Sequence, residues 1–90
     1  MAVYLITYAL KNQHRDYSNL FRAIKSNSTH WWHYLPDIWI INTNKTAEQL
    51  ARALYPFIEQ ADYLLVKRLA REHYGWLPKE AWTWLEDKNH

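Results

Sequence analysis

The stretch Val-Tyr-Leu-Ile-Thr-Tyr-Ala-Leu, residues 3–10, decides how this 90-residue chain folds. Its residues are apolar on both alternating sets. One set is Tyr4, Ile6 and Tyr8, and the other is Val3, Leu5 and Ala9. Aromatic and β-branched residues favour strands, and an apolar character on both sides is typical of a strand in the middle of a covered sheet. We therefore predict a central strand over residues 3–10.

Two amphipathic helices are predicted on either side of a pair of strands. Asp16 is expected to cap the first helix. The apolar residues of that helix recur at helical spacing, at Tyr17, Leu20, Phe21 and Ile24. Thr46 and Gln49 form a predicted capping box for the second helix, which should stop near Pro56.

Three further strands complete the pattern. Residues 29–35 and 38–43 read as a hairpin around Pro36 and Asp37, and residues 62–69 read as a fourth strand. The order of elements is β-α-β-β-α-β. This order predicts an α+β, ferredoxin-like fold, in which a four-stranded antiparallel sheet carries two helices on one face.

Residues 70–90 follow this core of residues 1–69 as a Trp-rich C-terminal extension. Pro78 suits the first position of a short helix over residues 79–87. Ala81, Trp82 and Leu85 lie along one side of that helix, with Trp84 off that side. We expect the extension to pack on the sheet or on a partner chain.

The second face of the sheet also needs a cover. Two helices cover one face, whereas the strands are apolar on both, and a large exposed apolar patch is unusual in a monomer. Either the extension folds over this face or a second chain does. We expect a homodimer through the open face of the sheet. The expected interface residues are Tyr8, Trp39, Trp76 and Trp82.

Six Trp residues in 90 are an excess with three readings. Three roles are open for Trp31, Trp32 and Trp39. These tryptophans could stack on nucleic-acid bases, belong to the core, or form the dimer interface. The chain lacks the Gly-Phe-rich ribonucleoprotein signature of RNA-recognition domains. We therefore expect one of Trp31 and Trp32 in the helix-side core and its neighbour at the interface.

Composition excludes several classes of protein. The chain has no Cys and one Gly, so it has no disulfide, no zinc-thiolate site and no phosphate-binding glycine loop. No apolar run reaches the roughly 18 residues of a membrane span. The start of the chain has no basic lead-in and no small-residue cleavage site, so we expect a cytoplasmic protein that does not enter a membrane.

Basic residues are the candidates for nucleic-acid binding. The net charge is +2, which permits such binding without indicating it. Lys11 and Arg15 follow the first strand, and three others cluster at the end of the fourth, namely Lys67, Arg68 and Arg71. The alternative is that these residues only solubilise an apolar surface. His14 either contacts phosphate, acts as a weak acid–base candidate, or is a solvated loop residue.

Five short motifs resemble the SinR-like family. They are Tyr4-Leu-Ile-Thr-Tyr8, His33-Tyr-Leu, Trp39-Ile-Ile-Asn-Thr43, Asp62-Tyr-Leu-Leu-Val66 and Gly75-Trp-Leu-Pro78. This family is grouped with the CRISPR-associated "Cas two" proteins and the virulence-associated D toxins. The resemblance implies a ferredoxin-like homodimer. It also implies that, in the nuclease members, an Asp after the first strand holds a divalent metal at the dimer interface.

Ala9 stands where the resemblance expects that Asp, so Ala9 and the preceding Tyr8 mark the expected catalytic position, with His14 a weaker candidate. A methyl group offers no oxygen to Mg²⁺ or Mn²⁺, so no metal or other cofactor is expected for the chain as written. The Ala is either natural or an inactivating change. We expect a small dimeric protein of the metal-dependent nuclease lineage that binds RNA or DNA and is inactive as written. The alternative is a non-catalytic dimeric scaffold or a toxin–antitoxin component that binds a protein or duplex nucleic acid.

Overall fold

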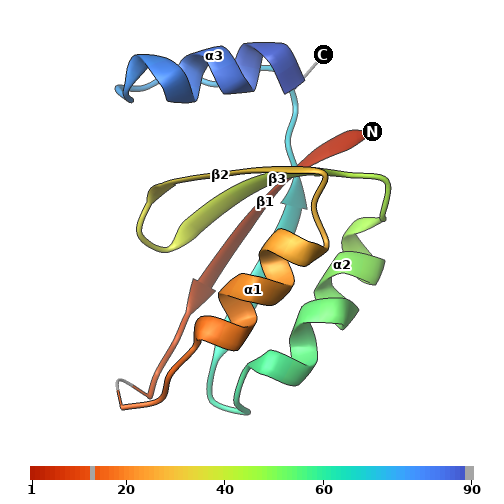
Figure 1. Ribbon diagram of the computed structural model, residues 1–90, viewed down its shortest axis with the longest axis vertical. Helices are drawn as coiled ribbons and strands as arrows, with labels where there is room; N and C mark the ends of the chain where they lie inside the picture. Colours follow the sequence, from red (N-terminus) through yellow and green to blue (C-terminus); the bar gives the residue numbers. More distant parts are fainter. Residues whose placement is uncertain (13, 89–90) are drawn as a thin grey trace.

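The strand over Ala2–Ala9, β1, lies in the middle of the sheet in a computed structural model that describes residues 1–12 and 14–88. It pairs with β3 (Ile38–Thr43) on one side and with β4 (Tyr63–Arg68) on the other. The fourth strand, β2 (His30–Leu35), pairs with the outer side of β3. All pairs are antiparallel and the order is β2-β3-β1-β4 (Figure 1). The predicted central strand and the ferredoxin-like βαββαβ order are confirmed.

Helices α1 (Ser18–Ser26) and α2 (Ala47–Leu54) cover one face of this sheet, and a short 3-10 helix, η1 (Tyr55–Phe57), follows α2 (Figure 1). The predicted capping box is present, because the Thr46 hydroxyl accepts from the Gln49 N–H at 3.1 Å and the Thr46 N–H donates to Gln49 Oε1 at 2.9 Å. The core between the layers buries apolar residues from both helices and from β1 and β3. They include Ile6, Leu20, Ile24, Trp39, Ile41, Leu50 and Leu54.

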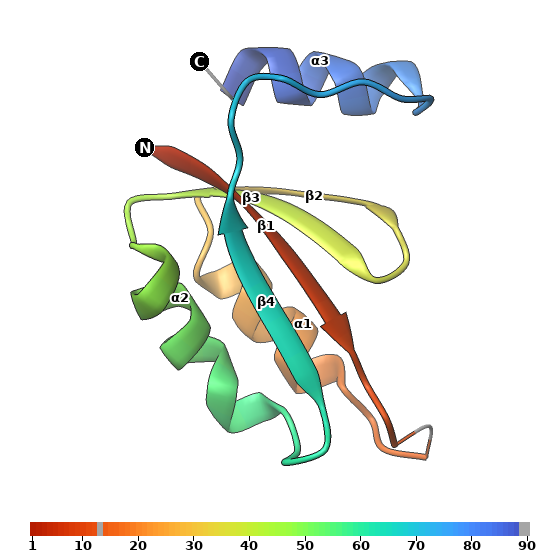
Figure 2. The same cartoon turned by 180° about the vertical axis from the view of Figure 1, so that it is seen from behind.

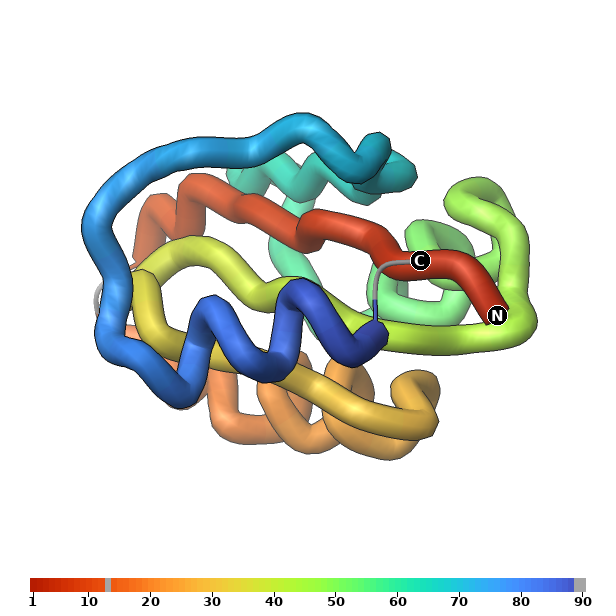
Figure 3. The backbone as a smooth tube through the Cα atoms, turned by 90° about the horizontal axis from the view of Figure 1, so that it is seen from above, coloured from red at the N-terminus to blue at the C-terminus, as the bar shows by residue number. Residues whose placement is uncertain are grey.

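The C-terminal extension folds back over the other face of the sheet. Its helix, α3 (Lys79–Lys88), lies across β2 and β3 (Figure 3). The carbonyl of Pro78 accepts from the N–H groups of Ala81 at 3.0 Å and Trp82 at 3.4 Å, so the helix begins one residue after Pro78 instead of at it. A second core forms beneath α3, from Val3, Trp32, Ile40, Ala81 and Leu85. Trp84 also packs against this core, although the helical spacing placed it off the apolar side.

The two adjacent tryptophans face opposite sides of β2, but not as expected. Trp32 is 1% exposed, and its indole N–H donates to the carbonyl of Ala81 at 3.3 Å, so α3 of the same chain covers it. Trp31 lies on the helix side, where its ring remains partly exposed and Lys25 Nζ is 4.7 Å from its centroid. The expectation of one core residue and one interface residue is therefore wrong for this pair.

Part of the second face stays uncovered. Figure 2 shows β4 and the C-terminal end of β1 with no helix in front of them. We call the outward-facing residues here the open strip. It consists of Thr7, Ala9, Tyr63 and Leu65. Because α3 crosses only the β2–β3 side, the sheet presents one half of its second face to its own chain and the other half to solvent.

Candidate functional site

Ala9 lies at the end of β1, on the open strip. It pairs with Tyr63 of β4, and paired residues point to the same side of a sheet. A shallow hollow of about 270 Å³ surrounds it. The residues that line this hollow are Thr7, Tyr8, Ala9, Tyr63, Leu64 and Leu65. The lining contains no carboxylate, so it offers a divalent cation none of the acidic ligands that it prefers.

Asp62, which precedes Tyr63 in the sequence, does not line this hollow, because its carboxylate is hydrogen-bonded within the chain. Its carboxylate accepts hydrogen bonds from the N–H of Lys11 at 2.8 Å, the N–H of Glu59 at 2.8 Å and the hydroxyl of Tyr17 at 2.9 Å. Among residues 1–12 and 14–88, no group of three or more His, Asp or Glu side chains is placed to hold a metal ion. The residues at the end of β1 therefore do not fit the metal that the family resemblance implies.

The electrostatics of Asp62 follow from these bonds. Burial raises the pKa of this carboxyl group, whereas the two backbone N–H groups, the Tyr17 hydroxyl and the charge of Arg15 lower it. The lowering outweighs the effect of burial, so the pKa lies below its ordinary value of 3.8. Asp62 is thus an ionised anchor that ties the loop after β1 to the start of β4.

Two of the four predicted interface residues lie in the helix-side core. The Trp39 indole donates to the Tyr8 hydroxyl at 3.0 Å, and that hydroxyl donates to the carbonyl of Pro36 at 3.3 Å. Burial, together with the nearby charge of Asp37, raises the pKa of Tyr8 although the bond from Trp39 lowers it. The other two, Trp76 and Trp82, belong to the C-terminal extension. Trp76 is exposed and Trp82 is half-buried.

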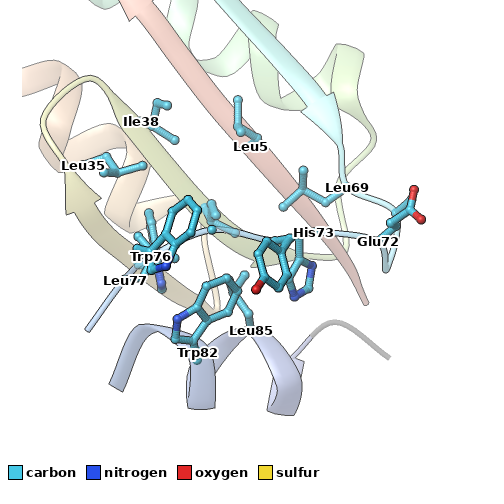
Figure 4. Close-up of a pocket in the computed structure, with 15 residues that line it drawn as sticks. Leu5, Leu35, Ile38, Leu69, Glu72, His73, Trp76, Leu77, Trp82 and Leu85 are labelled. Atoms are coloured by element: carbon cyan, nitrogen blue, oxygen red, sulfur yellow. The ribbon is translucent and has the colours of Figure 1, made fainter. Parts of the chain in front are cut away.

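An apolar cavity lies between the sheet and the C-terminal extension (Figure 4). Its volume is about 430 Å³. Leu5, Trp32, Leu35, Ile38 and Ile40 form the sheet side, and residues 69, 70 and 72–77 with Trp82 and Leu85 form the other. The sequence alone did not predict this cavity. The apolar Tyr74-Gly-Trp-Leu77 segment is visible in the sequence, but the cavity exists only because this segment lies opposite the sheet in the fold.

The basic candidates fall into two separate groups. Arg15 is bound within the chain, with an ion pair to Glu59 at 3.2 Å and a hydrogen bond to the Phe57 carbonyl at 3.4 Å. Lys11 Nζ lies 5.3 Å from the ring centroid of Tyr63, at the start of β4. Lys67 and Arg68 are at the other end of that strand, four to five residues further on. At about 3.3 Å per residue, the two groups are roughly 15 Å apart along the strand.

The second basic group gains a member that the sequence did not suggest. Arg68, Arg71 and Lys88 line one polar hollow of about 270 Å³, where β4 leaves the sheet beside the end of α3. Lys88 also pairs with the adjacent Asp87 at 3.0 Å. The packing of α3 on the second face brings Lys88 to Arg68 and Arg71. His14 is in another region, exposed in the loop between β1 and α1, where its backbone N–H donates to Asn12 Oδ1 at 3.1 Å.

No helix in the described part of the chain has both the length and the apolar character needed to cross a membrane. The chain was compared with protein-family models, curated proteins and solved structures. None of these comparisons found a match.

Proposed function

We propose that this chain is a non-catalytic, nucleic-acid-associated protein of the nuclease lineage, and that it acts as a homodimer through the open face of its sheet. The observation that carries the proposal is the open strip, which includes Ala9. This strip is apolar, uncovered by any described helix, and free of carboxylates. A surface of this kind is suited to association and lacks the acidic ligands that metal-dependent phosphodiester hydrolysis needs.

The exposed apolar area supports a dimer. Tyr63 is 69% exposed and Leu65 is 58% exposed, and above the same face Tyr74 is 90% and Trp76 is 89% exposed. Since a buried aromatic side chain covers about 150–250 Å², the three aromatic residues together with Leu65 expose roughly 600 Å². That area is at the upper end for a monomer and approaches the ~800 Å² per partner of a standard interface.

The basic group at the end of β4 supports the nucleic-acid part of the proposal. Arg68, Arg71 and Lys88 line one hollow, Lys67 precedes Arg68 in β4, and Lys67, Arg68 and Arg71 are exposed. A dimer carries two such groups. Contacts of Lys and Arg with phosphates release counterions, so this binding would be independent of sequence and weakened by salt.

The mass of the particle in solution tests the dimer. We expect light scattering to give twice the 11.0 kDa of the chain. Leu65→Lys places a charge on the open strip and should yield a monomer. Tyr55→Lys is the matched control, because Tyr55 is 72% exposed on η1, on the helix side. A wild-type chain that stays monomeric at high micromolar concentration contradicts the dimer.

Fluorescence anisotropy with a labelled RNA or DNA duplex tests the nucleic-acid part separately. We expect affinity to fall steeply between 50 and 200 mM salt, as it does when several phosphates are neutralised. The double variant Lys67→Glu with Arg71→Glu should lose binding and reduce the salt slope by about 0.9 for each lost contact. Arg22→Glu on α1 is the control. Equal loss in both variants, or no binding by wild type, counts against the proposed function.

A further inference from the structure

We infer that each copy in the dimer inserts the indole of Trp76 into the apolar cavity of its partner, so that the C-terminal extension provides both a protruding residue and the cavity that receives it. This inference rests on the homodimer of the proposed function, and it names the residues that join the two copies. Three observations support it: the character of the cavity, the exposure of Trp76, and the position of both on one face.

The cavity is suited to an apolar side chain. Its volume of about 430 Å³ lies in the range of natural binding pockets. Leu5 and Ile38 lie on the sheet side of it, and Leu69, Leu77 and Leu85 belong to the extension that forms the other side (Figure 4). Water needs two to four polar partners to be held well, and such walls supply few. An apolar occupant from outside the chain would therefore be favoured over water.

Trp76 is suited to be that occupant. Its side chain is 89% exposed at the mouth of the cavity (Figure 4). Tyr74, 90% exposed, supports it edge-to-face with ring centroids 6.0 Å apart. The segment between β4 and α3 that carries both residues contains neither helix nor strand. An exposed indole beside an apolar cavity of the same chain leaves two apolar surfaces in water, and both would be buried by a partner.

The arrangement suits two-fold symmetry. In a symmetric dimer the same patch is used twice, so each protruding residue of one copy meets a cavity of the other. Trp76 and the cavity lie next to each other on the face that also carries the open strip, which would form the rest of the interface. Trp is one of the residue types, with Tyr and Arg, that are enriched among the residues contributing most of the binding energy of interfaces.

Two variants separate the protruding residue from the cavity. Trp76→Ala removes the indole and, because the residue is exposed, should leave the fold intact. Leu5→Trp fills the cavity from β1. Circular dichroism shows whether Leu5→Trp folds, and if it does not, Leu35→Trp fills the cavity from the edge strand β2 instead. We expect either variant to weaken the dimer at least tenfold in analytical ultracentrifugation. Trp31→Ala on the helix side is the control and should leave the dimer unchanged.

Mixing the two variants gives the decisive result. In a mixed dimer, the intact Trp76 of the Leu5→Trp copy meets the open cavity of the Trp76→Ala copy, and the altered pair does not clash. We therefore expect the mixture to dimerise more tightly than either variant alone. If wild type dimerises but Trp76→Ala has no effect, or mixing restores nothing, the inference is wrong while the proposed dimer stands. If the wild-type chain is monomeric, the proposed dimer and the inference about Trp76 are both wrong. This holds even if the monomer binds a small apolar dye in the cavity.

Discussion

The hydroxyl of Tyr17 donates a hydrogen bond of 2.9 Å to the buried carboxylate of Asp62 and so joins the start of α1 to the start of β4. The same carboxylate also accepts the N–H groups of Lys11 and Glu59. Burial, then the bond to Asp62, raises the pKa of Tyr17, so this hydroxyl remains a donor at neutral pH. One acid therefore holds together the loop beside Ala9, the first helix and the edge strand of the open face.

Replacing Asp62 should be costly. Asp62→Ala leaves three donors without their acceptor in a buried place, and we expect a loss of about 3 kcal/mol in the free energy of unfolding. Tyr17→Phe removes one of the bonds and should cost about 1.5 kcal/mol. Urea denaturation measures both. Asp37→Ala, at the exposed tip of the hairpin, is the control, and an equal loss there would show that Asp62 is no special anchor.

The lowered pKa of Asp62 predicts how stability depends on pH. Because the pKa of Asp62 is lower in the folded protein than in the unfolded chain, the folded protein stabilises the ionised carboxylate. This contribution is present above the ordinary value of 3.8 and is lost as pH falls through the lowered pKa. The difference in unfolding free energy between wild type and Asp62→Asn should be constant near neutral pH and shrink below about pH 4. A difference that grows on acidification would contradict this assignment.

Trp32 should control the docking of α3. Trp32→Ala removes a fully buried indole and its bond to the carbonyl of Ala81, so we expect the free energy of unfolding to fall by about 3–5 kcal/mol. Trp32→Phe keeps much of the ring and should cost less. Once α3 is detached, trypsin should cut faster at Arg71. Trp31→Ala on the opposite side should leave this cleavage unchanged, and equal cleavage in both variants would show that α3 does not depend on Trp32.

Ala9→Asp tests the nuclease lineage. Position 9 is half-buried at a strand end on the open strip, so the fold should survive with a stability change of about 1 kcal/mol or less. We expect the variant to bind Mg²⁺ or Mn²⁺ in calorimetry and to cleave RNA or DNA, whereas the unmodified chain does neither. Ala9→Asn is the control, because it matches the shape without the charge. If Ala9→Asp stays inactive while its dimer forms, the alternative of a pure scaffold is favoured. Growth arrest on expressing Ala9→Asp alone would point to a toxin.

Much of the fold was predictable because its signals are local. The apolar run of residues 3–10 has no polar side, and only the centre of a sheet accommodates such a strand. Thr46 and Gln49 are three residues apart, so their capping box depends on one turn of chain. The candidate site was less predictable. Neither the cavity beneath the extension nor the approach of Lys88 to Arg68 has a local signal, since each joins segments far apart in the sequence.

The sequence by itself determined the elements, their order and the absence of an acid at position 9, because periodicity and residue identity are properties of the chain alone. Tertiary structure decided which surface covers each apolar side chain. An indole can be buried equally well by α1, by α3 or by another molecule, and nothing in the neighbourhood of Trp32 favours Ala81, 49 residues away. Packing of α3 over β2 and β3 made that choice. It left Trp76 and most of the open strip exposed to solvent, because α3 covers only the β2–β3 side of that face.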